Sequence, residues 1–522
     1  MPYNTNNPVP SSDLRDVYDN SQTMDEVVNS SSKEVTTRTG KKVKTLAGLQ
    51  SDVVGIGQSA NASAQAAANS ATAAAQSAAD AANSAAATGY VDAPFPDVWA
   101  PLSDDLRLLA GFAPADTITV GGTSYSLPTK SMTFTRSTTG TYIDKSGLLR
   151  TAAINEPRFE KEGLLIEAQS ANTFINSEDP TKWSGFDTRQ TLAVINDGDT
   201  KAVTAKITTT ATSSQTFYVY NANGITLSAG EYCTLSVRIK GTFGRCELRM
   251  RLDGNAVASV FMDFSSGAVV TPPSAPELTA TTRQGLDGYS YITATLKVLT
   301  DGIYSGSIVV AAPAGGAIAP VGTDFYLQTA QFEKSPQATS YIPTAGASVT
   351  RAADDPTLQR SGNGNYWGPI TISLELHCNG LTASDGISNN RRGVIAFYPS
   401  STEYVDMMID SSTTQSGKLA FAYGARSYNF YSGRIDDGKV HRVVSVTDTQ
   451  NNKSVIDGGN PSTPTAASRP APGTTSSVNS LIYFGRAAAG TTAPGQTMLN
   501  GHIRNLRIWH RALSDIQIKG LS

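Results

Sequence analysis

The sequence predicts a mainly β protein in which an alanine-rich helical stalk precedes two β-sandwich units. Three observations support this fold class. Residues 53–88 are almost entirely small and favour helix; the chain after residue 117 alternates apolar and polar side chains with the strand period of two; and turn-forming residues separate the alternating segments. With 522 residues, 39% of them hydrophobic, the chain can bury more than one core.

The composition argues against several classes of partner and anchor. The 41 Lys+Arg against 44 Asp+Glu give a net charge of −3, so there is no electrostatic reason to expect nucleic acid or an anionic membrane as partner. The first twenty residues show no apolar run behind a basic start, so we expect no secretory signal. Cys233, Cys246 and Cys378 are too few for a disulfide framework or a four-ligand zinc site. We expect no cofactor, no metal and no membrane insertion.

Residues 1–52 form a small N-terminal segment with little core of its own. Ser12 and Thr23 are candidate N-caps of two short helical pieces, and Thr39-Gly40 is a turn signal.

The alanine-rich tract, residues 53–88, is expected to be a helical stalk. The polar pairs Asn69-Ser70, Gln76-Ser77 and Asn83-Ser84 recur every seven residues, which is the period of a helical supercoil. If helical, 36 residues at about 1.5 Å each give a rod of about 54 Å. An alanine face buries little area, so such a helix is stable only in an oligomer. The alternative is a flexible low-complexity linker.

A joint follows the stalk, because Pro94, Pro96 and Pro101 lie close together before a short apolar segment that we expect to be helical. Residues 89–185 are then expected to form this joint and a small β-containing neck.

The first predicted sandwich spans residues 186–345. Its clearest strand is 232–240, with Cys233, Leu235, Val237 and Ile239 on one face and Arg238 and Lys240 among those on the other. Residues 246–252 repeat the alternation, and the intervening GTFG predicts a hairpin. That hairpin places Cys233 opposite Leu252, so both cysteines are interpreted as small core residues. Further strands are expected at 202–208, 216–220, 289–299, 306–312 and 324–332.

The second predicted sandwich spans residues 346–522. It opens with ITISLELHC, in which Ile370, Ile372, Leu374, Leu376 and Cys378 point inward. It closes with a short helix that a capping box of Ser514 and Gln517 begins.

The sequence predicts no catalytic residue. His377, His441, His502 and His510 match no metal motif, and His441, which follows the Asp437-Gly438 turn, is interpreted as structural or exposed. Nucleophile-elbow and phosphate-loop signatures are absent from the sequence. Asp406 and Asp410 share a strand face, but four residues span about 13 Å, too far for a glycosidase pair. Carboxylates from different strands could still converge.

The best binding constellation is residues 423–434, in which aromatic residues alternate with arginines. Aromatic rings stack on sugar rings and arginines donate hydrogen bonds, so the segment predicts a glycan platform. The residues expected to contact glycan are Tyr428, Tyr431, Arg426 and Arg434. The alternative is a strand whose aromatic residues belong to the core, and the same ambiguity applies to Tyr366-Trp367 and to Trp183.

Three segments resemble bacteriophage tail fibres and tailspikes. DLRDVYDNSQTMDEVVNSSSKEVTTRTGKKVKTLAGL is similar to the virion-anchoring segment of such fibres. MTFTRSTTGTYIDKSGLLRTAAINEPRFEKEGLLIEAQSANTFINSEDPTKW, with AQFEKSPQATSYIPTAGASVTRAAD, resembles a module of phage receptor-binding proteins that encloses a carbohydrate-binding-like jelly roll. DDGKVHRVVSV, VIDGG, LIYFGR and LNGHIRNLRIWHRALSDIQI resemble the laminin-G-like, concanavalin-type sandwich.

The resemblance implies a homotrimeric fibre of the phage tail, made in the host cytoplasm. Residues 1–52 would attach to a tail or adaptor protein of the virion. The sandwiches would bind lipopolysaccharide, capsule or an outer-membrane receptor. Two alternatives remain: a tailspike that degrades or deacetylates the polysaccharide, and an adaptor fibre that carries another receptor-binding protein.

Overall fold

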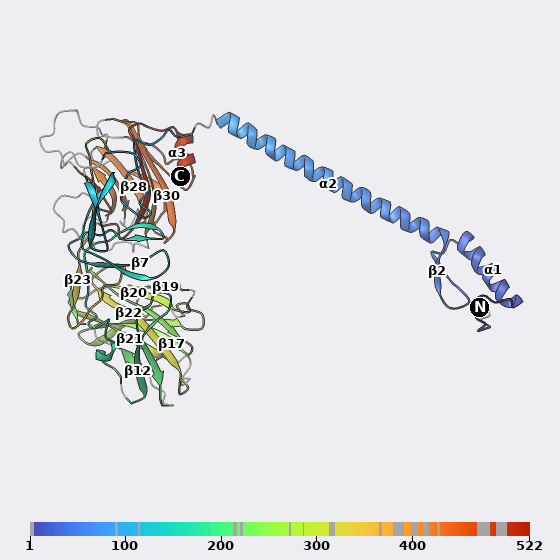
Figure 1. Ribbon diagram of the computed structural model, residues 1–522, viewed down its shortest axis with the longest axis horizontal. Helices are drawn as coiled ribbons and strands as arrows, with labels where there is room; N and C mark the ends of the chain where they lie inside the picture. The colour runs from blue at the N-terminus through green and yellow to red at the C-terminus, as the bar shows by residue number, and fades with distance from the viewer. Residues whose placement is uncertain are drawn as a thin grey trace. The chain divides into compact units, whose positions relative to one another are not determined.

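The computed structural model divides the chain into two compact units, Met1–Tyr90 and Val91–Ser522 (Figure 1). It describes residues 5–88, 92–112, 115–186, 188–211, 217–219, 223–270, 273–285, 287–312, 319–364, 368–378, 391–397, 404–410, 415, 417–424, 428–466, 481–486 and 498–522. Within these ranges no helix is both long and apolar enough to cross a membrane.

The N-terminal unit contains two helices and a hairpin: α1 Leu14–Asn29, β1 Glu34–Thr36, β2 Lys42–Lys44 and α2 Leu46–Thr88. The predicted caps are wrong. Asp13 caps α1 by accepting a hydrogen bond from the Arg15 backbone N–H, and Thr23 lies inside the helix, where its hydroxyl donates to the Asp19 carbonyl. A single helix therefore replaces the two expected pieces, because the Thr23 hydroxyl is satisfied within the helix and gives no reason to begin a new one.

Helix α2 confirms the prediction that the alanine-rich tract is helical. It begins at Leu46, seven residues before the predicted stalk, and its 43 residues correspond to a length of about 65 Å. After the two glycines at positions 55 and 57, alanine dominates, and no proline interrupts the helix.

The first sandwich, which we define as residues 190–333, consists of two antiparallel sheets around one core. The larger sheet has the order β12 Gln190–Asp197, β13 Ala202–Thr209, β22 Asp324–Glu333, β16 Tyr232–Gly241, β20 Ser290–Lys297 and β19 Leu278–Gln284. The other has the order β14 Phe217–Val219, β21 Gly302–Ala312, β17 Arg245–Leu252 and β18 Asn255–Asp263, with β15 Ile225–Leu227 also paired to β21. The strands predicted from alternation are thus confirmed within the described residues, which leave out positions 216 and 220.

The predicted hairpin between residues 232–240 and 246–252 is wrong. β16 pairs with β20 and β22, whereas β17 pairs with β18 and β21, so the two segments lie in opposite sheets. Both strands point their apolar residues into the shared core, a pattern identical to that of a hairpin. Cys233 and Cys246 are free and fully buried in this core, as expected of small core residues.

The second sandwich also has two sheets, and some of its strands come from residues 89–185, the predicted joint and neck. One sheet has the order β32 Thr465–Ala466, β31 Asn451–Ile456, β30 Val440–Thr447, β25 Ile370–Cys378, β34 Gly501–Trp509, β10 Gly163–Ile166 and β9 Phe159–Glu160, with β3 Val98–Ala100 also paired to β34. The other has the order β29 Tyr428–Arg434, β28 Lys418–Gly424, β27 Tyr404–Asp410, β26 Arg391–Phe397, β33 Leu481–Phe484, β24 Asp355–Gln359 and β6 Thr133–Thr135.

The core of the second sandwich therefore contains residues from both ends of the 91–522 unit. Val98, Leu106 and Leu164 pack in the same cluster as Ile372 and Ile503. The inward positions predicted for β25 are all buried. The capping box predicted at Ser514 and Gln517 is confirmed at the start of α3 Asp515–Leu521.

The helix expected after Pro101 does not form. Leu102 has a φ of +54°, which is incompatible with helix, and residues 103–112 run as turns and isolated bridges over the second sandwich. Burial of Leu102 and Leu106 in the sandwich core overrides the local apolar pattern.

Short elements complete the 91–522 unit among the described residues. They are the pairs β4 Ala115–Val120 with β5 Thr123–Ser131, β7 Gly140–Ile143 with β8 Leu149–Ala152, and β11 Ser170–Asn172 with β23 Val349–Arg351, together with the short 3₁₀ helix Pro180–Lys182.

A buried ion network joins segments that flank the first sandwich. Arg136 Nη1 lies 3.0 Å from Asp354 Oδ1, and Arg158 Nη2 bonds the other oxygen of Asp354. Glu167 Oε2 lies 2.9 Å from Arg158 Nη1 and 3.3 Å from Arg351 Nη2. No side chain in the network is more than 6% exposed. Burial alone would raise the pKa of Glu167, but the Arg351 and Arg158 charges lower it to about 2.

All five network residues lie within residues 132–183 and 330–354, so the network holds these two stretches of the chain together.

Candidate functional site

Residues 428–434 of the segment predicted as a glycan platform form β29, an edge strand of the second sandwich, and residues 423–424 end the neighbouring β28. The rings of Tyr428 and Phe430 lie 6.2 Å apart, whereas Tyr431 is half-buried and packs against the sandwich core. Arg434 forms two charged hydrogen bonds of 2.9 and 2.7 Å with Asp436. Arg426 lies outside the described residues. The described part of the segment therefore brings Tyr428 together with Phe430, but not with Tyr431.

Trp183 belongs to the core. It is 5% exposed, its ring meets Phe174 edge-on at 5.5 Å, and its indole N–H donates to the Asn176 carbonyl at 2.7 Å. Its interpretation as a possible binding residue is therefore replaced by a packing role. Tyr366 and Trp367 lie outside the described residues.

A cluster on the larger sheet of the first sandwich is a stronger candidate site. We call it the cation–tyrosine cluster and define it by Lys206, Arg238, Lys240, Tyr289 and Tyr326. Lys240 Nζ lies 4.4 Å from the ring centre of Tyr289 and 4.5 Å from that of Tyr326. Arg238 lies 4.5 Å from the Tyr289 ring centre and Lys206 lies 5.9 Å from that of Tyr326.

Strand register assembles this cluster. Lys240 on β16 and Lys206 on β13 both pair with Tyr326 on β22, so the three side chains form one row on the same face. The neighbouring Val237 and Ile239 are fully buried in the core, so alternation points Arg238 and Lys240 away from it.

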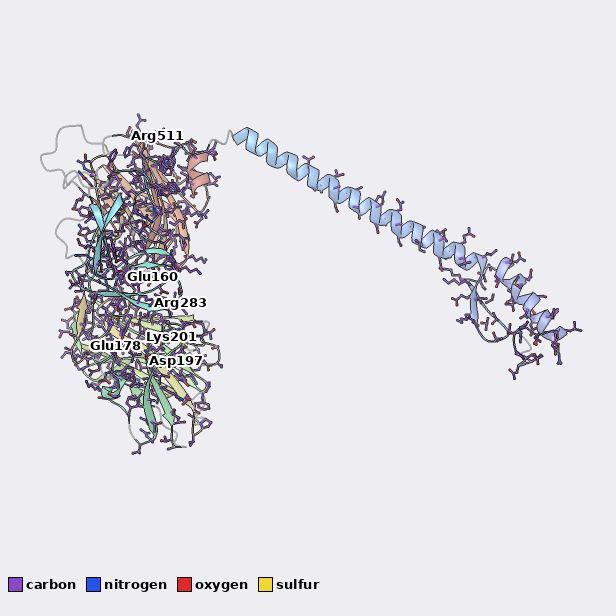
Figure 2. The ribbon with its side chains drawn as sticks, viewed as in Figure 1. Glu160, Glu178, Asp197, Lys201, Arg283 and Arg511 are labelled. Atoms are coloured by element: carbon purple, nitrogen blue, oxygen red, sulfur yellow. The ribbon has the colours of Figure 1, made fainter. Side chains whose placement is uncertain are left out.

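Carboxylates pair with every cation of the cluster. Asp197 lies 2.8 Å from Lys240 and accepts a 2.8 Å hydrogen bond from the Tyr289 hydroxyl; Asp287 lies 2.6 Å from Arg238 and Asp324 lies 2.9 Å from Lys206. The hydrogen bond from Lys240 lowers the pKa of Asp197 to about 2, so this carboxylate is ionised at neutral pH. Asp197 is labelled in Figure 2.

The cation–tyrosine cluster can bind a ligand rich in hydroxyl groups. The Lys240 and Lys206 side chains are 27% and 34% exposed, and the Asp197 and Asp324 side chains are 33% and 30% exposed. Charged donors and acceptors thus stand at the surface beside the partly exposed Tyr326 ring, whereas the Tyr289 ring is fully buried beneath them. Such a combination of charged groups and an aromatic ring can recognise a sugar. Sequence reasoning found the outward direction of Arg238 and Lys240 but not their tyrosine neighbours, because those come from strands far along the chain.

His441 occupies a different kind of site, a clamp between two carboxylates. Its Nδ1 lies 2.6 Å from Asp457 and its Nε2 lies 2.9 Å from Asp437. Burial lowers the pKa of His441, but the hydrogen bonds to Asp457 and Asp437 outweigh it and leave the pKa raised. The pKa of Asp437 is lowered to about 2; burial opposes this shift, and the hydrogen bond from His441 is the largest cause that favours it.

The clamp should make stability depend on pH. The pKa of His441 is higher in the folded protein than in the unfolded chain. The stability that protonated His441 contributes is therefore fully present below the unfolded pKa of about 6.5 and is lost as the pH rises through the folded pKa. The Asp437 contribution is lost only as pH falls from about 4 toward 2. We expect His441→Gln to destabilise the protein by about 1 kcal/mol at pH 5.5, because solvent screens the half-exposed carboxylates, and by less at pH 8.5. Melting curves at both pH values check this; an equal loss at both would contradict it.

Asp406 and Asp410 lie on one face of β27, as predicted, and both are buried. They are separated along a single strand, so they do not form a close carboxylate pair with each other.

Comparison with known proteins identifies no family for this chain. No family model and no curated protein matches it. Solved structures that are similar include a heptameric SAP-like pentraxin from Limulus polyphemus, with 16% identity over 29% of this chain and 68% of that one and a TM-score of 0.22. The fourth and fifth LG domains of the mouse laminin alpha1 chain match with 15% identity over 56% and 88%, at a TM-score of 0.21.

A third similar structure is domain 4 of an extracellular arabinanase from Geobacillus stearothermophilus in complex with arabinotriose. It has 14% identity over 35% of this chain and 81% of that one, at a TM-score of 0.25. All three TM-scores are low, so the β-sandwich architecture of this chain rests on its own strand pairing and cores.

Proposed function

We propose that the protein is a bacteriophage tail fibre that attaches to the virion through residues 1–52 and binds a bacterial surface receptor through its sandwiches. The observation that carries this proposal is the order of parts along the chain: a small helical unit, a 43-residue helix and then two sandwiches. The polysaccharide of the cell surface, lipopolysaccharide or capsule, is the proposed receptor, with an outer-membrane protein as the other candidate.

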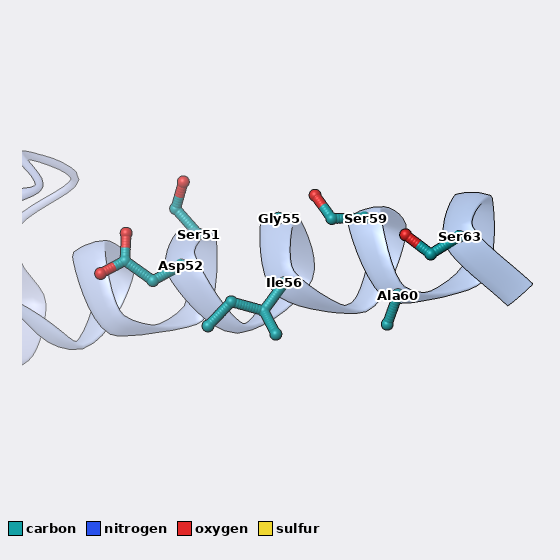
Figure 3. Close-up of a pocket in the computed structure, with 7 residues that line it drawn as sticks. All are labelled: Ser51, Asp52, Gly55, Ile56, Ser59, Ala60 and Ser63. Atoms are coloured by element: carbon teal, nitrogen blue, oxygen red, sulfur yellow. The ribbon is translucent and has the colours of Figure 1, made fainter. Parts of the chain in front are cut away.

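Helix α2 supports a homotrimer. Leu46, Leu49, Val53 and Ile56 are spaced by three, four and three residues, and each is 49 to 69% exposed in the single chain. This spacing is that of a coiled-coil seam, and Ala60 and Ser63 continue it. Figure 3 shows Ile56, Ala60 and Ser63 along this part of the helix. Burying the stripe between copies removes apolar surface from water.

We expect the full chain to sediment as a trimer of its 54.8 kDa mass. Ile56→Asp should raise the dissociation constant at least a hundredfold, because it buries a charge in the seam. Val54→Asp is the matched control, since Val54 is 51% exposed but lies beside the stripe rather than in it. Analytical ultracentrifugation distinguishes the outcomes: a monomeric wild type at micromolar concentration would refute the trimer.

The cation–tyrosine cluster is the proposed receptor contact, and Tyr428, Tyr431, Arg426 and Arg434 remain a second predicted contact. Lys240→Ala should weaken binding to purified host polysaccharide at least tenfold, because Lys240 contacts both tyrosine rings and Asp197. Lys334→Ala is the control, since Lys334 is 51% exposed and pairs with Glu231, outside the cluster. Equal binding by both variants would exclude the cluster, and a loss with Tyr428→Ala alone would assign binding to β29.

The proposed fibre binds its receptor without cleaving it. Release of reducing ends or acetate from the polysaccharide by the purified protein would favour a degrading tailspike instead. A partner protein that docks on residues 1–150, with no glycan bound to the sandwiches, would favour an adaptor fibre.

A further inference from the structure

Two glutamates and a histidine meet where the neck crosses the second sandwich. The β9–β10 turn lies along β34, with Leu165 opposite His502 and Leu164 opposite Ile503. Gly163, at a φ of +123°, permits this approach, because a Cβ there would stand 2.7 Å from the Ile503 carbonyl. The turn therefore carries Glu160 and Glu162 to His502.

These three side chains offer a set of converging ligand atoms. One ligand atom from each of Glu160, Glu162 and His502 lies within 4.8 Å of the others. His502 Nε2 is 2.9 Å from one Glu160 oxygen, while the other Glu160 oxygen accepts the Ile143 backbone N–H at 2.7 Å and fixes the carboxylate. Among the described residues, no group forms a hydrogen bond or ion pair with the Glu162 carboxylate, so it can rotate toward the other two.

A second histidine, His377, orients His502 by contacting its Nδ1 atom, whereas its Nε2 atom faces Glu160. His377 and His502 are opposite each other on β25 and β34, and their Nδ1 atoms are 3.0 Å apart. His377 Nε2 is in turn 3.1 Å from the Gly438 carbonyl oxygen. If His377 Nε2–H donates to that carbonyl, His377 Nδ1 accepts the Nδ1–H of His502, and His502 Nε2 presents its lone pair to the glutamates. A metal-binding histidine is oriented in this way.

We propose that Glu160, Glu162 and His502 bind a divalent first-row transition metal ion, with zinc as the best match, and that His377 positions His502. One imidazole and two carboxylates suit zinc, cobalt or manganese, whereas calcium prefers a shell made of oxygen alone. Ligand atoms around a tetrahedral zinc are roughly 3 to 3.5 Å apart, so rotation of Glu162 closes the site. The bound ion holds the β9–β10 hairpin against β34 of the second sandwich.

The test uses the full chain without an affinity tag, stripped with a chelator and titrated with zinc or cobalt chloride. We expect one zinc per chain by calorimetry, a visible cobalt spectrum that zinc displaces, and a higher melting temperature with metal. Glu162→Gln should weaken zinc binding at least tenfold while leaving the melting temperature without metal unchanged, because its carboxylate has no partner within the described part of the chain. His502→Gln should abolish the cobalt spectrum.

Glu277→Gln is the matched control, because Glu277 is also half-exposed and lies outside the cluster. Equal zinc binding by wild type, Glu162→Gln and Glu277→Gln would overturn the proposal. So would the absence of zinc binding at roughly 100 micromolar zinc, because even a weak site would be partly occupied at that concentration. His377→Gln should weaken zinc binding less than His502→Gln, since a positioning residue does not itself touch the metal. A crystal with an anomalous zinc signal elsewhere would also refute the assignment.

Discussion

Asp354→Ala should destabilise the protein by about 3 to 5 kcal/mol, because it leaves Arg136 and Arg158 buried without their shared counter-charge. Asp354 also accepts the Glu167 backbone N–H at 2.8 Å, so the variant loses a hydrogen bond in addition to two ion pairs. Urea unfolding of the full chain, followed by far-UV circular dichroism, measures the loss.

The neighbouring residue supplies the control. Asp355 pairs with Arg486 at 3.5 Å, and both side chains are at least 30% exposed, so Asp355→Ala should cost less than about 1 kcal/mol. If the two variants lost equal stability, the buried network would not be the reason for the effect.

Trp183→Ala should also cost about 3 to 5 kcal/mol, because it opens a cavity beside Phe174 and leaves the Asn176 carbonyl without its indole donor. Binding to polysaccharide should persist at temperatures where the variant is folded, since Trp183 is buried. Phe95→Ala is the comparison, with a ring that is 67% exposed and an expected loss below about 1 kcal/mol. Weakened binding by folded Trp183→Ala protein would restore the surface interpretation of this residue.

The strands of this protein could be predicted from alternation, but their partners could not. Residues 232–240 and 246–252 carry the same inward pattern whether they share a sheet or face each other across a core. The link between them is short, which favoured a hairpin, but the three residues 242–244 also suffice to cross from one sheet to the other. Burial against the opposite sheet decides between the two, and that depends on strands from residue 255 onward.

The candidate site was predictable only in part for the same reason. Outward Arg238 and Lys240 follow from the alternation of β16, whereas Tyr326 and Lys206 reach them through the register of β22 and β13. The aromatic segment at 428–434 was visible in the sequence because its residues are consecutive. Residues that are consecutive on a strand alternate between its faces, which explains why Tyr428 and Tyr431 are not neighbours in space.

The buried ion network also orders events during synthesis. Arg136, Arg158 and Glu167 leave the ribosome about two hundred residues before Asp354, and the complete first sandwich is translated in between. That sandwich has its own core and can fold while the side chains of Arg136 and Arg158 are still exposed to solvent. The core of the second sandwich contains residues from before and after the first sandwich. The second sandwich must therefore fold last, by bringing together chain segments that are separated by a long loop. A nascent chain stalled before residue 354 should therefore hold one folded sandwich and an open, aggregation-prone half of the other.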